Sequence, residues 1–209
     1  STITLTNAST GGTWSSSNPG VATINNSGVV TGISNGVATL IYTAATGCSS
    51  SGNLQVNVNG KPATTINGPS SICIGGNTSI LPSSGGIWVS SNPSVATITN
   101  AGIITAVASG TSTFTFTESS TGCISNASAL VTVNSNPVGN ISGPSSICAG
   151  SFTTVTPTVG GSWTSLNPTI ASVTNSGIVQ GISAGTATFI FTQASTGCIS
   201  GATSSLTVV

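Results

Sequence analysis

Short runs in which apolar and polar residues alternate extend along the whole chain, separated by turn residues. A period of two is typical of a β-strand with one buried face, and helical periodicity appears nowhere. The clearest runs place large side chains two residues apart: Leu40 with Tyr42, Phe114 with Phe116, and Phe189 with Phe191. The last run of each segment repeats this with Val56 and Val58, Val131 and Val133, and Leu206 and Val208. We therefore expect an all-β protein in which these side chains form the core.

The whole pattern recurs with a period of about 75 residues, which exceeds the roughly 20–50 residues typical of solenoid repeats. The intervals between Trp14, Trp88 and Trp163, and those between Cys48, Cys123 and Cys198, all match this period. A unit of this length with its own strands and turns is large enough to be an independent sandwich. With several short strands in each unit, the sequence predicts tandem immunoglobulin-like Greek-key β-sandwich domains over residues 1–59, 60–134 and 135–209.

The domain joins and the first unit carry further expectations. The joins at 59–62 and 134–137 are short and contain proline, which favours semi-rigid connections. The first unit lacks residues that precede the equivalent of Ser1 in the other two, so we interpret Ser1 as a cut point and expect an edge there that could accept a strand.

Turn residues recur at fixed places between the runs. Asn-Pro at 18/19, 92/93 and 167/168 favours a turn, because proline restricts φ and asparagine forms local hydrogen bonds. Two glycines follow in every unit, at positions where a positive φ is expected: Gly28 and Gly36, Gly102 and Gly110, and Gly177 and Gly185.

The composition argues against catalysis, metal binding and the binding of nucleic acids or anionic membranes. The chain has one basic residue, Lys61, one acidic residue, Glu118, and no histidine. Acid–base catalysis, catalytic triads and metal sites all need more ionisable groups than these, so we expect no enzyme activity, cofactor or metal site. Nucleic acids and anionic membranes attract clustered basic residues, which are missing, and no apolar run could span a membrane. A cross-link between Lys61 and an asparagine is disfavoured because the third unit has Asn136 and Gln193 at the equivalent positions.

The repeated phrases carry a family resemblance. Trp-x-Ser-x-Asn-Pro-x-Val-Ala-x-Ile begins at Trp14 and Trp88, with a close variant at Trp163, and Gly-Val-Val-Thr-Gly follows at 28–32. This combination resembles the bacterial immunoglobulin-like domain of group 2, over all three units. The phrases Gly-Pro-Ser-Ser-Ile-Cys at 68–73 and 143–148, and Thr-Gly-Cys at 46–48, 121–123 and 196–198, are similar to repeats in giant secreted adhesins of the Bacteroidota, including gliding-motility adhesins. The resemblance implies an extracellular stalk or adhesive module without an active site.

The cysteines recur in step with the repeat, which favours disulfides formed in an oxidising, extracellular compartment. The candidates are Cys48, Cys73, Cys123, Cys148 and Cys198. Bridges within a repeat, Cys73 to Cys123 and Cys148 to Cys198, would each close a loop of about 50 residues. Sandwich topology places those partners at opposite poles, roughly 20 Å apart, and favours Cys73 with Cys198, between neighbouring domains. The sequence leaves both pairings open, and it places a partner for Cys48 at position −2, upstream of Ser1.

The three tryptophans allow two interpretations. One tryptophan on an early strand of each unit is typical of a sandwich core, whereas an exposed tryptophan would suit sugar stacking. We predict that Trp14, Trp88 and Trp163 belong to the cores with Phe114, Phe116, Phe189 and Phe191.

The missing charge bears on function. Exposed strand edges are usually protected by charged residues, which this chain lacks. We expect a structural or adhesive repeat segment of a long protein at the bacterial cell surface, with neighbouring repeats, copies of itself in a fibre and surface polysaccharide as its partners. The alternative is a carbohydrate-binding module of a secreted protein. Differences between the units are scattered and conservative, which favours a spacer.

Overall fold

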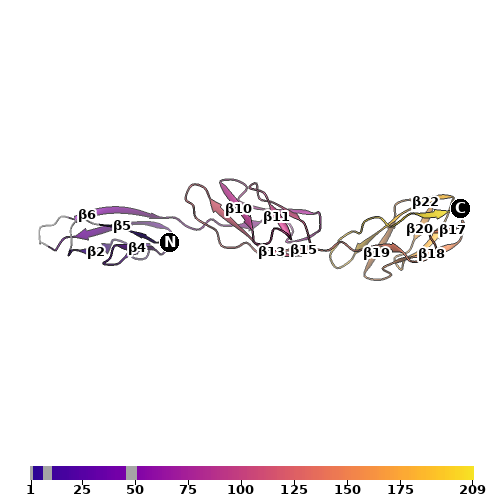
Figure 1. The fold of residues 1–209 in the computed structure, drawn as a ribbon, viewed down its shortest axis with the longest axis horizontal. Coiled ribbons are helices and arrows are strands. Elements are labelled where there is room, and N and C mark those ends of the chain that lie inside the picture. Colours follow the sequence, from indigo (N-terminus) through magenta and orange to yellow (C-terminus); the bar gives the residue numbers. More distant parts are fainter. Residues whose placement is uncertain (1, 7–10, 46–50) are drawn as a thin grey trace. The chain divides into compact units, whose positions relative to one another are not determined.

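The computed structural model describes residues 2–6, 11–45 and 51–209, and the regular elements of these residues are 24 β-strands. They form two compact units: Ser1–Pro62 with Thr117–Asn126, and Ala63–Phe116 with Ala127–Val209. Figure 1 labels strands along the chain. We use repeat 1, repeat 2 and repeat 3 for residues 1–59, 60–134 and 135–209. The predicted all-β immunoglobulin-like fold is confirmed.

Repeat 2 has two layers, in which the strand pairs are mostly antiparallel. One sheet has the order β11-β12-β9-β7, and the other layer contains the ladders β13-β15-β8 and β10-β14. The strand bounds are β7 Thr65–Ile66, β8 Ser71–Cys73, β9 Asn77–Leu81, β10 Gly86–Ser90, β11 Ala96–Ile98, β12 Ile103–Ala106, β13 Gly110–Ser112, β14 Phe114–Glu118 and β15 Val131–Asn134. The first segment of the repeat contributes β7 to one layer and β8, which pairs in parallel with β15, to the other.

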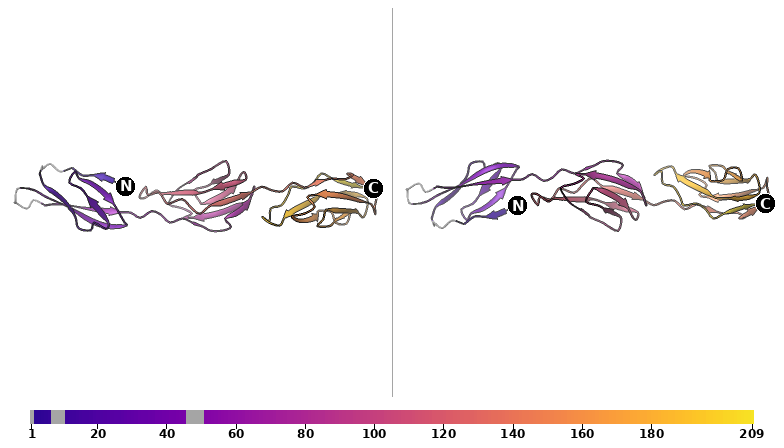
Figure 2. Two further views of the ribbon diagram at one scale, coloured as in Figure 1. Left: turned by 90° about the horizontal axis from the view of Figure 1, so that it is seen from below. Right: turned by 90° about the horizontal axis from the view of Figure 1, so that it is seen from above.

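Repeat 3 has the same arrangement, and Figure 2 shows its strands in two layers. The sheet β16-β18-β21-β20 faces the ladders β17-β24-β22 and β19-β23. The bounds are β16 Asn140–Ile141, β17 Ser146–Ile147, β18 Phe152–Thr156, β19 Gly161–Ser165, β20 Ala171–Val173, β21 Ile178–Gly181, β22 Gly185–Ala187, β23 Phe189–Gln193 and β24 Leu206–Val208.

Repeat 1 contains two three-stranded sheets, β1-β4-β3 and β2-β5-β6. Its strands are β1 Thr2–Thr4, β2 Thr13–Ser16, β3 Ala22–Ile24, β4 Val29–Gly32, β5 Gly36–Thr43 and β6 Ser51–Val58. The long strand β5 pairs with β2 on one side and β6 on the other. Leu40 and Tyr42 on this strand are buried, as the alternation predicts.

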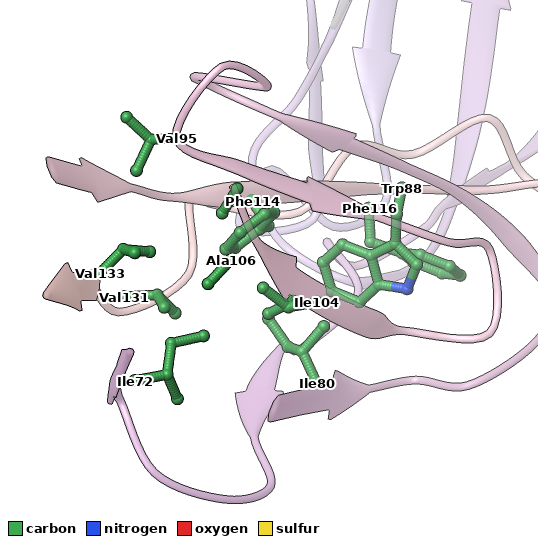
Figure 3. Packing of buried hydrophobic residues seen from close by; sticks show 11 residues of the cluster. Ile72, Ile80, Trp88, Val95, Ile104, Ala106, Phe114, Phe116, Val131 and Val133 are labelled. Carbon is green, nitrogen blue, oxygen red and sulfur yellow. The ribbon is translucent and has the colours of Figure 1, made fainter. Parts of the chain in front are cut away.

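Each repeat has its own hydrophobic cluster. In repeat 2 the indole of Trp88 lies against the ring of Phe116, with centroids 5.0 Å apart (Figure 3). Trp163 and Phe191 repeat this contact in repeat 3 at 5.2 Å. Because each phenylalanine is 2% exposed, its burial contributes about 1.5–3 kcal/mol to folding. The period-two pattern thus places the phenylalanines of β14 and β23 between the layers.

The turn residues act as the sequence predicts. The carbonyl of Asn92 accepts hydrogen bonds from the amides of Val95 and Ala96, which closes the Asn-Pro turn, and Asn18 and Asn167 do the same. All six predicted glycines have positive φ. At Gly102 (φ 74°) a side chain would overlap the carbonyl oxygen of Ile80, so both the backbone conformation and the lack of space favour glycine there.

Candidate functional site

In the part of the chain that the structure describes, no group of three or more histidine, cysteine, aspartate or glutamate residues could hold a metal ion. The Lys61 ammonium donates a hydrogen bond to the side-chain oxygen of Asn126 at 2.9 Å. The Glu118 carboxylate accepts one from the hydroxyl of Thr121 at 2.6 Å, within its own turn. The described residues also include no helix that could cross a membrane. The remaining candidate functional residues are the cysteines and the tryptophans.

A disulfide joins Cys73 of repeat 2 to Cys198 of repeat 3, with Cα atoms 5.6 Å apart and a separation of 125 in sequence. This is the pairing between neighbouring repeats that sandwich topology favours. The pairing within a repeat is not formed, because Cys123 and Cys148 are both free. Cys48 lies outside the described residues. The candidate functional site is thus a covalent connection between two consecutive sandwiches.

Strand pairing places Cys73 at the pole of repeat 2 where the chain leaves it. Strand β8 runs parallel to the last strand, β15, and Cys73 is level with Asn134 in that ladder. The amide of Ile74 then donates to the carbonyl of Asn134 at 3.0 Å. Because β15 leads directly into repeat 3, the cysteine lies beside the connection between the repeats.

A tight loop places Cys198 at the other end of the junction, at the pole of repeat 3 where the chain enters this repeat. Strand β23 ends at Gln193, whose amide donates to the carbonyl of Cys198 at 2.9 Å. The amide of Cys198 in turn donates to the Thr196 hydroxyl at 3.2 Å, and Gly197 between them has a φ of 74°. The phrase Thr-Gly-Cys is therefore a structural unit in which threonine caps the cysteine amide and glycine permits the turn.

An asparagine in the connection also contributes to the junction, and sequence reasoning missed it. The side-chain amide of Asn136 donates to the carbonyl of Ile74 at 3.2 Å, next to the bridged Cys73. Asn134 donates to the hydroxyl of Ser71 at 2.8 Å on the neighbouring strand. The sequence signal for this contact is the pair of asparagines in the join Asn-Ser-Asn-Pro, from which only a proline-containing connection is predicted.

The tryptophans differ between the repeats. Trp88 and Trp163 are each 5% exposed, and their indole N–H groups donate to the carbonyls of Pro82 and Pro157 at 3.0 and 2.8 Å. Trp14 is only half-buried, with its ring 4.9 Å from that of Tyr42. A cavity of about 200 Å³ lies beside these two rings, bounded also by Leu5 and Leu54. The core prediction is thus met by two of the tryptophans and only partly by the third.

The fold and the junction define a class: an all-β protein of immunoglobulin-like sandwiches, two of which are joined by a disulfide. No family model matches the sequence, and the comparison with curated proteins finds no match. Among solved structures, the chain is similar to invasin, a bacterial integrin-binding protein, at 15% identity and a TM-score of 0.39, covering 90% of this chain and 50% of that one. A fragment of intimin, in complex with the intimin-binding domain of its translocated receptor, gives 13% identity and a TM-score of 0.35, covering 78% and 55%. Domains 4–9 of the surface layer protein SbsC give 16% and 0.26, covering 99% and 40%. The chain thus spans about half or less of the length of these structures.

Proposed function

We propose that the chain is a structural and adhesive segment of a long extracellular bacterial surface protein, with repeats 1, 2 and 3 as its domains. The disulfide between Cys73 and Cys198 is the observation that carries this proposal. A bond between neighbouring sandwiches adds nothing to a binding pocket in either one, but it prevents the two from separating under load. It also requires an oxidising compartment, as outside the cell.

The path of an applied force follows from this bond. Tension between the chain ends passes from Cys73 directly to Cys198, so the segment between them carries no load while the disulfide is intact. Most of repeat 2 and much of repeat 3 lie in that segment. Such shielding suits a stalk or filament that must keep its length.

Single-molecule extension tests this function. With the chain held at its two ends, the oxidised form should lack the extension of the segment between Cys73 and Cys198. Reduction should add roughly 410–450 Å of contour length, at about 3.3–3.6 Å for each step of the 125-residue separation. The variant Cys73→Ser should show the full length without reductant. Equal contour lengths for the oxidised and reduced chains would exclude a load-bearing role for this bond.

The same proposal includes the narrower family: repeats of the group 2 immunoglobulin-like type, as in gliding-type adhesins. The near absence of charge favours association with copies of the chain or with neutral surface polysaccharide. Because there are almost no charges for ions to screen, such association should depend little on salt. Light scattering of the chain at low and high ionic strength measures this, and strictly monomeric behaviour at high concentration would remove self-association from the proposal.

Carbohydrate binding is the second candidate, and the partly exposed Trp14 favours it. The Trp14 indole, next to Tyr42, could stack against a sugar ring that occupies the adjacent cavity. A panel of soluble and insoluble glycans, tested with the native chain and with Trp14→Ala, measures this. Binding lost in Trp14→Ala would support a binding module in repeat 1, while equal binding by both forms would assign the affinity to another surface.

A further inference from the structure

We infer that Cys148 is half of a second junction disulfide, whose partner is the Thr-Gly-Cys loop of another repeat of this type. The inference rests on the proposed function of a repeat array and extends it to a rule of assembly. We call Cys73 and Cys148 the early cysteines of repeats 2 and 3, and Cys123 and Cys198 the late ones. In this rule the early cysteine of one repeat forms a disulfide with the late cysteine of the next. Cys123 is the complementary half, ready to accept an early cysteine.

The loop that carries Cys148 has the same backbone connections as the loop of the bridged Cys73. In repeat 2 the three amides after the cysteine donate to the carbonyls of Asn134, Ala106 and Cys73, at 3.0, 3.0 and 2.8 Å. In repeat 3 the equivalent amides donate to the carbonyls of Val209, Gly181 and Cys148, at 2.9, 2.9 and 3.0 Å. The middle residue of each loop is a glycine with a φ of 83°. Cys148 therefore lies at the start of a loop equivalent to the one that follows Cys73, and Cys73 forms a disulfide.

The late-cysteine loops match equally well. The amides of Glu118 and Gly122 donate to the carbonyls of Cys123 and Glu118, at 2.9 and 2.8 Å, as those of Gln193 and Gly197 do around Cys198. Thr121 accepts from the amide of Cys123 at 3.2 Å, as Thr196 does from that of Cys198. The environment of the sulfur differs, since Cys198 is fully buried in its junction whereas Cys123 is partly exposed.

Spacing explains why these two thiols do not pair with each other. The bridge that is present joins cysteines separated by 125 in sequence, which is the step from the early to the late cysteine of a repeat plus one full repeat. If this separation is the rule, the partner of Cys148 would be at position 273 and that of Cys123 at position −2, so the rule assigns each of them to another repeat. Cys148 is exposed beside the last strand, where such a repeat can reach it.

The bond forms by thiol–disulfide exchange. One thiolate attacks an external disulfide such as oxidised glutathione, and the second thiolate then displaces the glutathione sulfur from this mixed disulfide. One S–S bond is made and one is broken, and two glutathione thiols carry away the two electrons and two protons.

A second copy of the chain serves as the partner in the test. The full chain is reduced, reoxidised at high concentration with reduced and oxidised glutathione, and analysed by non-reducing electrophoresis and mass spectrometry of linked peptides. We expect oligomers in which Cys148 is linked to a Thr-Gly-Cys cysteine of another copy, Cys48 or Cys123. These oligomers should be lost in Cys148→Ser, while the Cys73–Cys198 bridge remains.

A relocated thiol is the matched control. The double variant Cys148→Ser with Ser176→Cys moves the thiol to another exposed turn of repeat 3, and it should give several-fold fewer links to Thr-Gly-Cys loops. The inference is overturned if this variant links as well as the native chain, if Cys148 joins mainly to Cys148, or if Cys148 stays a free thiol. Each of these outcomes leaves the extension experiment on Cys73–Cys198, and with it the proposed function, unaffected.

Discussion

Repeats 2 and 3 share the aromatic packing of their interiors and differ on their exteriors. Their tryptophan and phenylalanine ring centroids lie 5.0 and 5.2 Å apart, and both indoles bind a proline carbonyl. On the outer face of β10, however, Ile87 and Val89 are more than half exposed, and the equivalent residues on β19 are Ser162 and Thr164. The interior is constrained by packing, whereas the outer face varies freely. A surface that read one ligand in every repeat would not vary in this way.

The largest expected effect concerns the bond that joins the two repeats. In the chain-entropy model, closing a loop of this length stabilises the folded state by up to about 5 kcal/mol. Reduction should therefore lower the melting temperature of repeats 2 and 3 and uncouple their unfolding. Thermal melts with and without a phosphine reductant measure this, and Cys73→Ser should reproduce the reduced melt.

The same melts at two pH values supply the control. A change from mildly acidic to neutral pH should shift the melt much less than reduction does, because the chain has one acidic and one basic side chain. A large shift with pH and none with reductant would contradict this account.

The next effect tests whether the two interiors are energetically equal. Phe116→Ala and Phe191→Ala each remove a fully packed ring beside a tryptophan, at an expected cost of about 3–5 kcal/mol. Chemical denaturation of the reduced chain, followed by tryptophan fluorescence, should show one repeat weakened in each variant. Clearly unequal losses in the two variants would show that similar geometry conceals unequal packing.

Glycines in the two repeats give a smaller effect with an internal control. At Gly102 a methyl group would overlap the Ile80 carbonyl oxygen, and Gly177 meets Val155 in the same way. Gly75 has a similar φ of 83° but open space around it. We expect Gly75→Ala to cost about 1–2 kcal/mol for the backbone conformation alone, and Gly102→Ala to cost clearly more. Equal losses in urea denaturation would mean that the turn relaxes and the overlap has no cost.

Much of this fold could be predicted from local signals. Alternation placed Phe114 and Phe116 in the core, and Asn-Pro and glycine placed the turns, because these depend on neighbouring residues. The bridge between Cys73 and Cys198 could be narrowed to two pairings but not decided, since it depends on which pole of the sandwich each loop reaches. The half-buried position of Trp14 could not be predicted either, because the repeated sequence around it implies the same burial in every repeat.

The smallest effect concerns a buried hydroxyl in repeat 2 that repeat 3 lacks. Ser112 is 1% exposed and its hydroxyl lies 2.9 Å from that of Ser90, which also donates to the carbonyl of Ala96 at 2.7 Å. Repeat 3 has Ala187 at this position, and Ser165 there makes the same bond to the carbonyl of Ala171 at 2.7 Å. Removing a hydroxyl while its neighbour keeps a partner leaves no polar group unsatisfied.

Ser112→Ala should therefore change the free energy of unfolding by less than about 1 kcal/mol, and Ala187→Ser in repeat 3 should be similarly mild because Ser165 can accept its hydroxyl. Urea denaturation of both variants measures the pair. A loss clearly above this limit in Ser112→Ala would mean that the hydroxyl network of repeat 2, including the amide of Asn92 at 3.2 Å from the Ser112 oxygen, holds the Asn-Pro turn in place. The interiors of the two repeats would then differ in how they are stabilised, although their packing is alike.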